Sequence, residues 1–344
     1  MALPNPDPTA YGSGGALAGD VLGAYLRAQA TAFLRALRLH GEAAGSAPAG
    51  GAAAGAAEAA RGLRGAARRI AGSLATFRAA TDTAWADGLR GELDWVSSVL
   101  AEEHASAALP ARLLDALHRL SGSPERPGAA AGGSGAGPGR PTSGPTGLAT
   151  GPGGLAAGPA RAAALLERQL APARARAHAA ALQALGSSRF HAVADAVAVL
   201  ASEVPPAPAA ARGRAADVLL PLAEVPRARL AAAVAALPPA AQAPGYDAAQ
   251  DGSLQEVRRL LRLHRYAREA LGEDVARLAE AGGVLARHGD AAEAAAASAA
   301  AARTPRIAPA TAYALGVLHA DQRHEAEAAR RAFHRIWHPA PAPV

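Results

Sequence analysis

The stretch of the chain that says most about the fold is residues 255–269, QEVRRLLRLHRYARE. On a helix that turns about 100° per residue, five polar side chains of this run fall within about 80° of one another. These are Gln255, Arg258, Arg262, Arg265 and Glu269. The spacing predicts a helix that carries a basic stripe along one face.

A second stripe of the same design lies in residues 61–70, RGLRGAARRI, where Arg61, Arg64 and Arg68 fall within about 60° of one another. A charge run is ordinarily a solvated helix face. Three like charges on one face repel one another, however, and Glu58 and Glu269 supply only partial compensation. Two such stripes at matching places in the two halves of the chain favour a binding surface over a solvated face.

The composition predicts an all-α protein. Half of the 344 residues are apolar, mostly Ala, Leu and Val, and only 3% are aromatic. Ala and Leu are strong helix formers, while β-branched and aromatic residues favour strands. The net charge is +6, and every basic residue other than histidine is Arg, a bias that the GC-rich genome of a bacterium would also produce. The absence of cysteine excludes disulfides, thiolate zinc sites and a cysteine nucleophile.

The positions of Gly- and Pro-rich stretches, which interrupt helices, predict the organisation of the chain. We expect a disordered N-terminus over 1–15, a first helical half over 16–120, a flexible Gly/Pro/Ser-rich linker over 121–158 and a second helical half over 159–338. Each half presents a basic helix, then a long helix, then a Leu-Ala turn, over 100–105 in the first half and 285–290 in the second, which indicates a pseudo-two-fold internal repeat. The expected helices are 20–39, 56–77, 82–100, 109–120, 161–184, 188–202, 210–220, 226–237, 251–270, 272–288, 289–302 and 309–337.

At this point the pattern resembles the CHAD family, the conserved histidine α-helical domain proteins. The stripe of residues 255–269 is similar to the family's second signature, in which Arg265-Tyr266-x-x-Glu269 keeps its spacing, and residues 61–71 are similar to the first. Leu185–Phe190, Leu285–Asp290 and 314–337 resemble further family segments. The sequence departs from the family at both signature histidines, where Arg61 and Gln255 stand, and at an Arg-Asp pair replaced by His104-Ala105.

The resemblance implies two four-helix-bundle-like halves and a basic groove or pore that binds inorganic polyphosphate. It also implies association with polyphosphate granules, no catalytic activity and no cofactor. Because Arg does not titrate near neutral pH, we expect binding here to depend less on pH between 6 and 8 than a histidine-lined site would. The two stripes and the resemblance together nominate as polyphosphate-binding residues Arg61, Arg64, Arg68, Arg69, Arg258, Arg262, Arg265 and Tyr266.

Other functions remain as alternatives. Arginine stripes and a high pI are also the footprint of a nucleic-acid-binding protein, although aromatic residues for base stacking are few. A structural descendant of the family that no longer binds a ligand is a second alternative. No catalytic motif and no metal-ligand set is evident; His334 and His338 have i, i+4 spacing but lack further ligands. Without a secretory signal or an apolar span of about 20 residues, we expect a cytoplasmic protein with no membrane contact.

Overall fold

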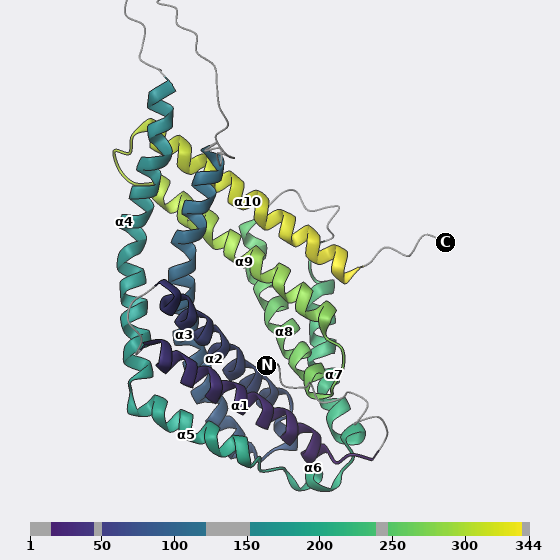
Figure 1. The fold of residues 1–344 in the computed structure, drawn as a ribbon. Coiled ribbons are helices and arrows are strands. Elements are labelled where there is room, and N and C mark those ends of the chain that lie inside the picture. The colour runs from purple at the N-terminus through teal and green to yellow at the C-terminus, as the bar shows by residue number, and fades with distance from the viewer. Residues whose placement is uncertain (1–14, 45–49, 122–151, 239–246, 339–344) are drawn as a thin grey trace, which may run out of the picture.

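The structure, a computed structural model, describes residues 15–44, 50–121, 152–238 and 247–338 (Figure 1). Within these ranges it is all-α, as predicted: helices follow one another without a strand, and the β-type pairing is limited to two isolated bridges. The helices are α1 Ala18–Ala44, α2 Gly50–Thr76, η2 Arg78–Ala80, α3 Thr83–Leu120, α4 Pro152–Leu185, α5 Ser188–Ser202, α6 Pro208–Arg212, α7 Ala215–Ala235, η3 Ala248–Gln250, α8 Asp251–Ala270, α9 Ala276–Ala302 and α10 Pro309–Trp337.

Three hydrophobic clusters hold the helices together, and they do not divide at the predicted linker. The largest joins α1, α2 and the first part of α3 to α5, α6 and the start of α7, with Phe33 and Phe77 fully buried. A second joins the end of α7 to α8, α9 and α10 around Phe333. A third joins the end of α3 to α4, α9 and α10. The two segments therefore share cores, and their description as separate halves with a pseudo-two-fold repeat stays a prediction.

Backbone hydrogen bonds also connect the beginning of the chain to its middle. The amide of Ala18 donates to the carbonyl of Gly213 at 2.9 Å, and the amide of Ala215 donates to the carbonyl of Ala16 at 2.8 Å. The amide of Asp82 donates to the carbonyl of Pro205 at 3.1 Å. These bonds fix the N-terminal ends of α1 and α3 against the connections between α5 and α7.

The predicted helix breaks were partly wrong. α3 continues through residues 101–108 and Pro110, although separate helices were expected over 82–100 and 109–120. α7 continues through Pro221 and Pro226, although separate helices were expected over 210–220 and 226–237. Proline lacks an amide donor and ordinarily interrupts a helix at a cost of about 3 kcal/mol. Here Pro226 is itself buried in the packed face of α7, so tertiary packing outweighs the local preference. The same holds at Gly289, which lies inside α9 and not in the expected turn.

The predicted N-terminal tail and linker fall largely outside the described residues. The structure describes the chain from residue 15 onward, and it describes nothing between 122 and 151. α4 begins at Pro152, so the last residues assigned to the linker are helical. The connection between the expected helices 20–39 and 56–77 is also shorter than predicted, because α1 extends to Ala44 and α2 begins at Gly50.

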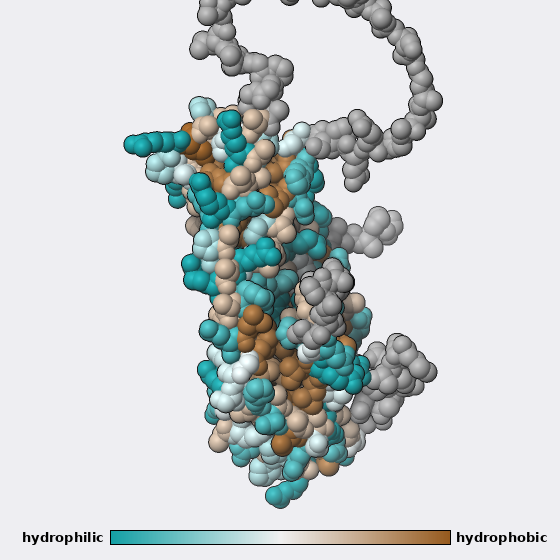
Figure 2. All heavy atoms as spheres, turned by 60° about the vertical axis from the view of Figure 1, so that its left-hand side comes forward, coloured by the Kyte–Doolittle hydropathy of each residue, from teal (hydrophilic) through white to brown (hydrophobic). Residues whose placement is uncertain are grey.

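The surface mixes hydrophilic and apolar side chains. On the face where α4 comes forward, hydrophobic residues gather in the lower part of the molecule among hydrophilic ones (Figure 2). Large apolar side chains that remain exposed include Leu182 of α4 and Val199 of α5. None of the described helices combines the length and the apolar character that crossing a bilayer requires.

Helices α2 and α8, which carry the two basic stripes, approach each other closely at Gly72. A Cβ atom on Gly72 would lie 2.8 Å from Cδ2 of Tyr266 and 3.3 Å from Cδ2 of Leu263. Both Gly72 and Tyr266 are buried. The missing side chain at residue 72 therefore allows α8 to lie against α2 at the level of Tyr266.

We expect Gly72→Ala to lower the free energy of unfolding by about 1–3 kcal/mol, because the added methyl group would overpack the α2–α8 contact. Gly91→Ala on α3 is the matched control, since a Cβ there meets nothing within 4 Å. The control should leave stability unchanged or raise it by about 0.5–1 kcal/mol, the usual preference of a helix for Ala. Urea unfolding of both variants measures the difference, and equal stabilities would contradict the close contact.

Candidate anion-binding site

Four arginines of the two stripes face one another between α2 and α8. Arg64 and Arg68 lie on α2, Arg258 and Arg262 lie on α8, and all four are half-buried. Burial, followed by the charges of Arg68 and Arg258, lowers the pKa of Arg64 to about 10. Burial and the same two neighbours lower the pKa of Arg262 to about 10. These four residues are called the arginine cluster below.

The arginine cluster has little opposite charge. Within the described parts of the chain, none of its four guanidinium groups forms an ion pair with a carboxylate. The Nε atoms of Arg64 and Arg68 are buried without a hydrogen-bond partner. Asp290 of α9 contributes a negative charge near the cluster. Its carboxylate raises the pKa of Arg64 and of Arg258, against the lowering that burial causes. Repulsion within the cluster is therefore only partly balanced by the protein itself.

A glycine of α9 makes room for the cluster. A Cβ atom on Gly289 would lie 3.0 Å from Nε2 of Gln255 and 3.3 Å from Nη1 of Arg258. Gln255, which stands where the family signature has a histidine, thus lies beside Arg258 over α9. It adds a hydrogen-bond donor to this surface but no charge.

Two further arginines of the predicted set, Arg69 and Arg265, share one carboxylate partner. Nε of Arg69 donates to Oε2 of Glu269 at 3.0 Å, and Nε of Arg265 lies 3.1 Å from Oε1 of the same carboxylate. The hydroxyl of Tyr25 on α1 also donates to Glu269, at 3.1 Å. Burial and the adjacent carboxylate raise the pKa of Tyr25, and although burial alone would lower the pKa of Arg69, Glu269 raises it. This network joins α1, α2 and α8 beneath the cluster.

Two more of the predicted residues lie apart from the cluster's centre. The ring of Tyr266 is buried against Gly72, with the guanidinium carbons of Arg69 and Arg265 at 5.7 and 5.1 Å from its centroid. Its place in the fold is that of a packing residue. Arg61 is exposed at the end of the α2 stripe and pairs with Glu58, the partial compensation expected from the sequence.

The structure adds two neighbours that sequence reasoning missed. His104 of α3 lies close enough to the stripe that, after burial, the charges of Arg64 and Arg61 lower its pKa. Asp290 was assigned to a turn with His288, but both lie inside α9 and have different partners. His288 is buried, with Nδ1 3.0 Å from the carbonyl of Ala326 and Nε2 3.1 Å from Oδ1 of Asp251. Asp290 was missed because α9 continues through Gly289, and His104 was missed because α3 continues through residues 101–108.

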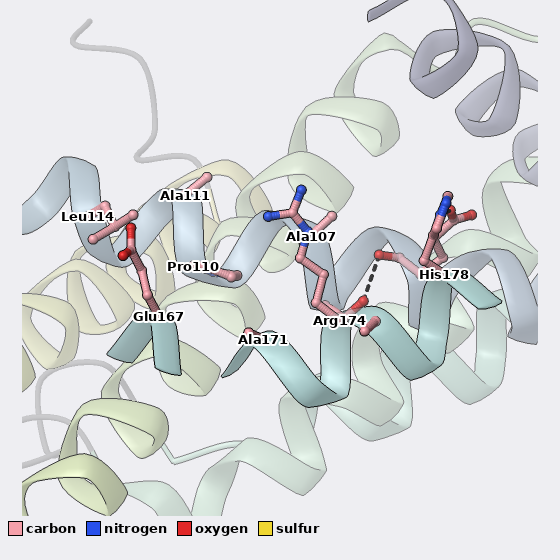
Figure 3. A pocket seen from close by; sticks show the side chains of 11 residues that line it. Ala107, Pro110, Ala111, Leu114, Glu167, Ala171, Arg174 and His178 are labelled. Atoms are coloured by element: carbon pink, nitrogen blue, oxygen red, sulfur yellow. Dashed lines mark hydrogen bonds and ion pairs between the residues drawn. The ribbon is translucent and has the colours of Figure 1, made fainter. Parts of the chain in front are cut away.

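Two adjoining cavities lie beside the α2 end of the cluster. The smaller, about 290 Å³, is lined by residues of α1 to α4 that include Arg61, Arg64 and His104. The larger, about 770 Å³, lies between α3 and α4 among small side chains such as Ala107, Ala111 and Ala171 (Figure 3). Both cavities include Glu103, Ala107 and His178 in their walls, so one continues into the other.

No described group of three or more His, Asp or Glu side chains is arranged to hold a metal ion. The rings of His334 and His338 stack at 6.5 Å between centroids near the end of α10. The pair lines a shallow space with Arg331 and Arg335, whose charges do not suit a cation.

Comparison with known proteins agrees with the all-α fold and gives its family. The model of the CHAD domain matches residues 28–282, which include both stripes. The chain belongs to the CHAD family. Among solved structures, it is similar to PptA from Streptomyces chartreusis at 53% identity, with a TM-score of 0.71 over 94% of this chain and 99% of that one. The CHAD domain from the plant Ricinus communis shares the fold, at 21% identity and a TM-score of 0.57 over 96% of this chain and 94% of that one. No curated protein sequence matches the chain.

Repulsion within the cluster should lower the stability of the fold, whereas Glu269 should raise it. Substitution of a cluster arginine and substitution of Glu269 should therefore change the free energy of unfolding in opposite directions. Arg64→Met keeps the apolar stem but removes a buried unpartnered donor and a like charge, so it should raise the free energy of unfolding by about 0.5–1 kcal/mol at low salt. Glu269→Gln should lower it by about 1–3 kcal/mol, because three partners lose their acceptor charge.

Urea unfolding at low and high salt checks this pair of expectations. Added salt should stabilise the wild type more than the Arg64→Met variant, since screening weakens the repulsion that the substitution removes. An equal loss of stability in both variants would make Arg64 a structural residue of this CHAD domain and contradict the assignment.

Proposed function

We propose that this protein binds inorganic polyphosphate without catalysis, through the arginine cluster formed by α2 and α8. The observation that carries the proposal is the convergence of Arg64 and Arg68 with Arg258 and Arg262, which lie nearly 200 residues apart in sequence, without ion-pair partners among the described residues. A chain of phosphates would supply the opposite charge that the protein does not. Association with polyphosphate granules is part of the proposal.

The chemistry of the side chains suits phosphate oxygens. The planar guanidinium group can donate two parallel hydrogen bonds to an oxyanion, and it keeps its charge at any working pH. A row of arginines on each of two adjacent helices suits a linear ligand that repeats the same anion. Nucleic acid carries the same repeating charge, but the surface offers few aromatic side chains for base stacking, with 3% aromatic residues in the whole chain.

The direct test compares two variants of equal charge in titrations with long-chain polyphosphate. The cluster variant carries Arg64→Gln, Arg68→Gln, Arg258→Gln and Arg262→Gln. We expect it to lose affinity by roughly 100-fold or more near physiological salt, and to reduce the slope of log K against log salt by about four, one for each phosphate contact. The control variant replaces the exposed residues Arg35, Arg168, Arg212 and Arg229 by Gln and should lose far less.

Duplex DNA of matched charge separates the remaining functions. Polyphosphate binding that exceeds DNA binding and falls only in the cluster variant supports the proposal. Tighter binding of DNA would favour the nucleic-acid alternative. Weak binding of both polymers, lost in salt and equal in the two variants, would mean a helical scaffold that has kept the family fold without its ligand.

The pH dependence of binding should be flat near neutrality. Arginines do not titrate there, and His104, the histidine whose pKa the stripe affects, is held below the usual range and is therefore neutral. We expect the affinity for polyphosphate to change less than about threefold between pH 6.5 and 8. Below this range it should rise, because bound phosphate raises the pKa of His104 and the added charge is present only below that pKa.

His104→Ala should abolish the rise at low pH, and the exposed His191→Ala on α5 is the control. His40, His178, Glu103 and Asp290 also face this region, so a rise that persists in the His104 variant would place the titrating group among them. A steep loss of affinity as the pH is raised through 7 would contradict the arginine-based account.

A further inference from the structure

The smaller of the two cavities has features that the binding of a bare phosphate chain does not use. It is about 290 Å³ in volume and lies between the end of α1, the first part of α2, the middle of α3 and the end of α4. Arg61 and Arg64 form its wall on the side of the arginine cluster. A volume near 300 Å³ is at the small end of sites for organic ligands, so the cavity could hold a ring system beside a phosphate group. It is called the side pocket below.

Most of the side pocket is apolar, which inorganic phosphate would leave unused. Alanines of α2 and α4 and the leucines Leu100, Leu182 and Leu185 line it. Leu182 remains 56% exposed, although a large apolar side chain is ordinarily covered. An apolar surface that adjoins a row of arginines is complementary to a ligand with an apolar face at one end and phosphates at the other.

The polar groups in the side pocket indicate a heterocycle and not a hydrocarbon. His40, His104 and Glu103 line it together with His178. Nδ1 of His178 lies 2.7 Å from Oε1 of Glu103, which positions the carboxylate at the wall. Among the described residues, Oε2 of Glu103 has no hydrogen-bond partner. A carboxylate accepts hydrogen bonds from ring and exocyclic N–H groups, and imidazole rings stack on flat heterocycles.

We propose that the side pocket binds the base of a purine nucleoside polyphosphate, whose phosphates lie on Arg61, Arg64 and the neighbouring arginines of the cluster. Glu103 accepts hydrogen bonds from the N–H groups of the base, and this favours guanine, which presents two such donors side by side. An alkyl diphosphate would instead bury its chain against three histidines and a carboxylate, which would lose hydration without compensation.

This inference rests on the proposed function, because it uses the same arginines for the phosphates. The proposed function requires only the arginines, because inorganic polyphosphate does not need the rest of the side pocket, whereas the nucleotide also requires the pocket. A ligand that keeps the phosphates and lacks the base therefore separates them.

The experiment is a calorimetric titration of the full chain with GTP, ATP, inorganic tripolyphosphate and farnesyl diphosphate, without Mg²⁺ and at fixed ionic strength. GTP should bind at least about tenfold more tightly than tripolyphosphate, the expected effect of burying and stacking one base. Ala57→Phe, at an exposed position that lines the side pocket, should abolish this advantage and leave the affinity for tripolyphosphate unchanged. Ala75→Phe, exposed elsewhere on α2, is the matched control and should change neither.

A second variant tests the polar contact. Glu103→Gln should weaken GTP but not tripolyphosphate, because it removes an acceptor and also a negative charge near the arginines. Equal affinities for GTP and tripolyphosphate, equal effects of Ala57→Phe on both, or tighter binding of farnesyl diphosphate than of GTP would overturn the inference. Failure of the proposed function has a different signature: long-chain polyphosphate and tripolyphosphate do not bind, whether or not GTP does.

Discussion

The contact between α2 and α8 places the two basic stripes against each other, and the candidate site depends on it. At Gly72 the helices approach closely enough that Tyr266 and Leu263 occupy the space of the missing side chain. Arg69, one turn before Gly72 on α2, and Arg265, next to Tyr266 on α8, share the carboxylate of Glu269, to which Tyr25 of α1 also donates. Both helices are fixed at this level, and the arginines that precede it on each helix, Arg64 and Arg68 on α2 and Arg258 and Arg262 on α8, therefore face one another.

Arginines that look alike in the sequence have different roles in this arrangement, some in holding the helices together and others at the candidate site. Those that reach Glu269 neutralise a half-buried carboxylate and hold the helices together. Arg64, Arg68, Arg258 and Arg262 form no ion pair within the described parts of the chain, and the charge of Asp290 acts on Arg64 and Arg258. Half-buried charges without a partner lower the stability of a fold. Several such charges gathered at one place on the surface are therefore typical of a binding site. The fold supplies the rigid support, and an external anion would complete the charge balance.

Much of this could be predicted from the sequence, and the rest could not for identifiable reasons. The all-α fold followed from the abundance of Ala and Leu, and both stripes lie on helices as their spacing predicted. The division of the arginines between structure and ligand could not be predicted, because it depends on where one carboxylate, Glu269, meets a second helix. His104 and Asp290 were missed because α3 continues through residues 101–108 and α9 through Gly289, where helix ends were expected and tertiary packing prevails.

The central claim is that α2 and α8 form one site, and a double-mutant cycle on polyphosphate affinity tests it most directly. Arg64→Gln on α2 and Arg258→Gln on α8 should each weaken binding of long-chain polyphosphate. The double variant should depart from additivity by at least about 0.5 kcal/mol, as expected for residues that contact the same ligand segment. If one of the two substitutions has no effect, or if the losses are additive within error, the two helices do not act on the same phosphates and the account is wrong.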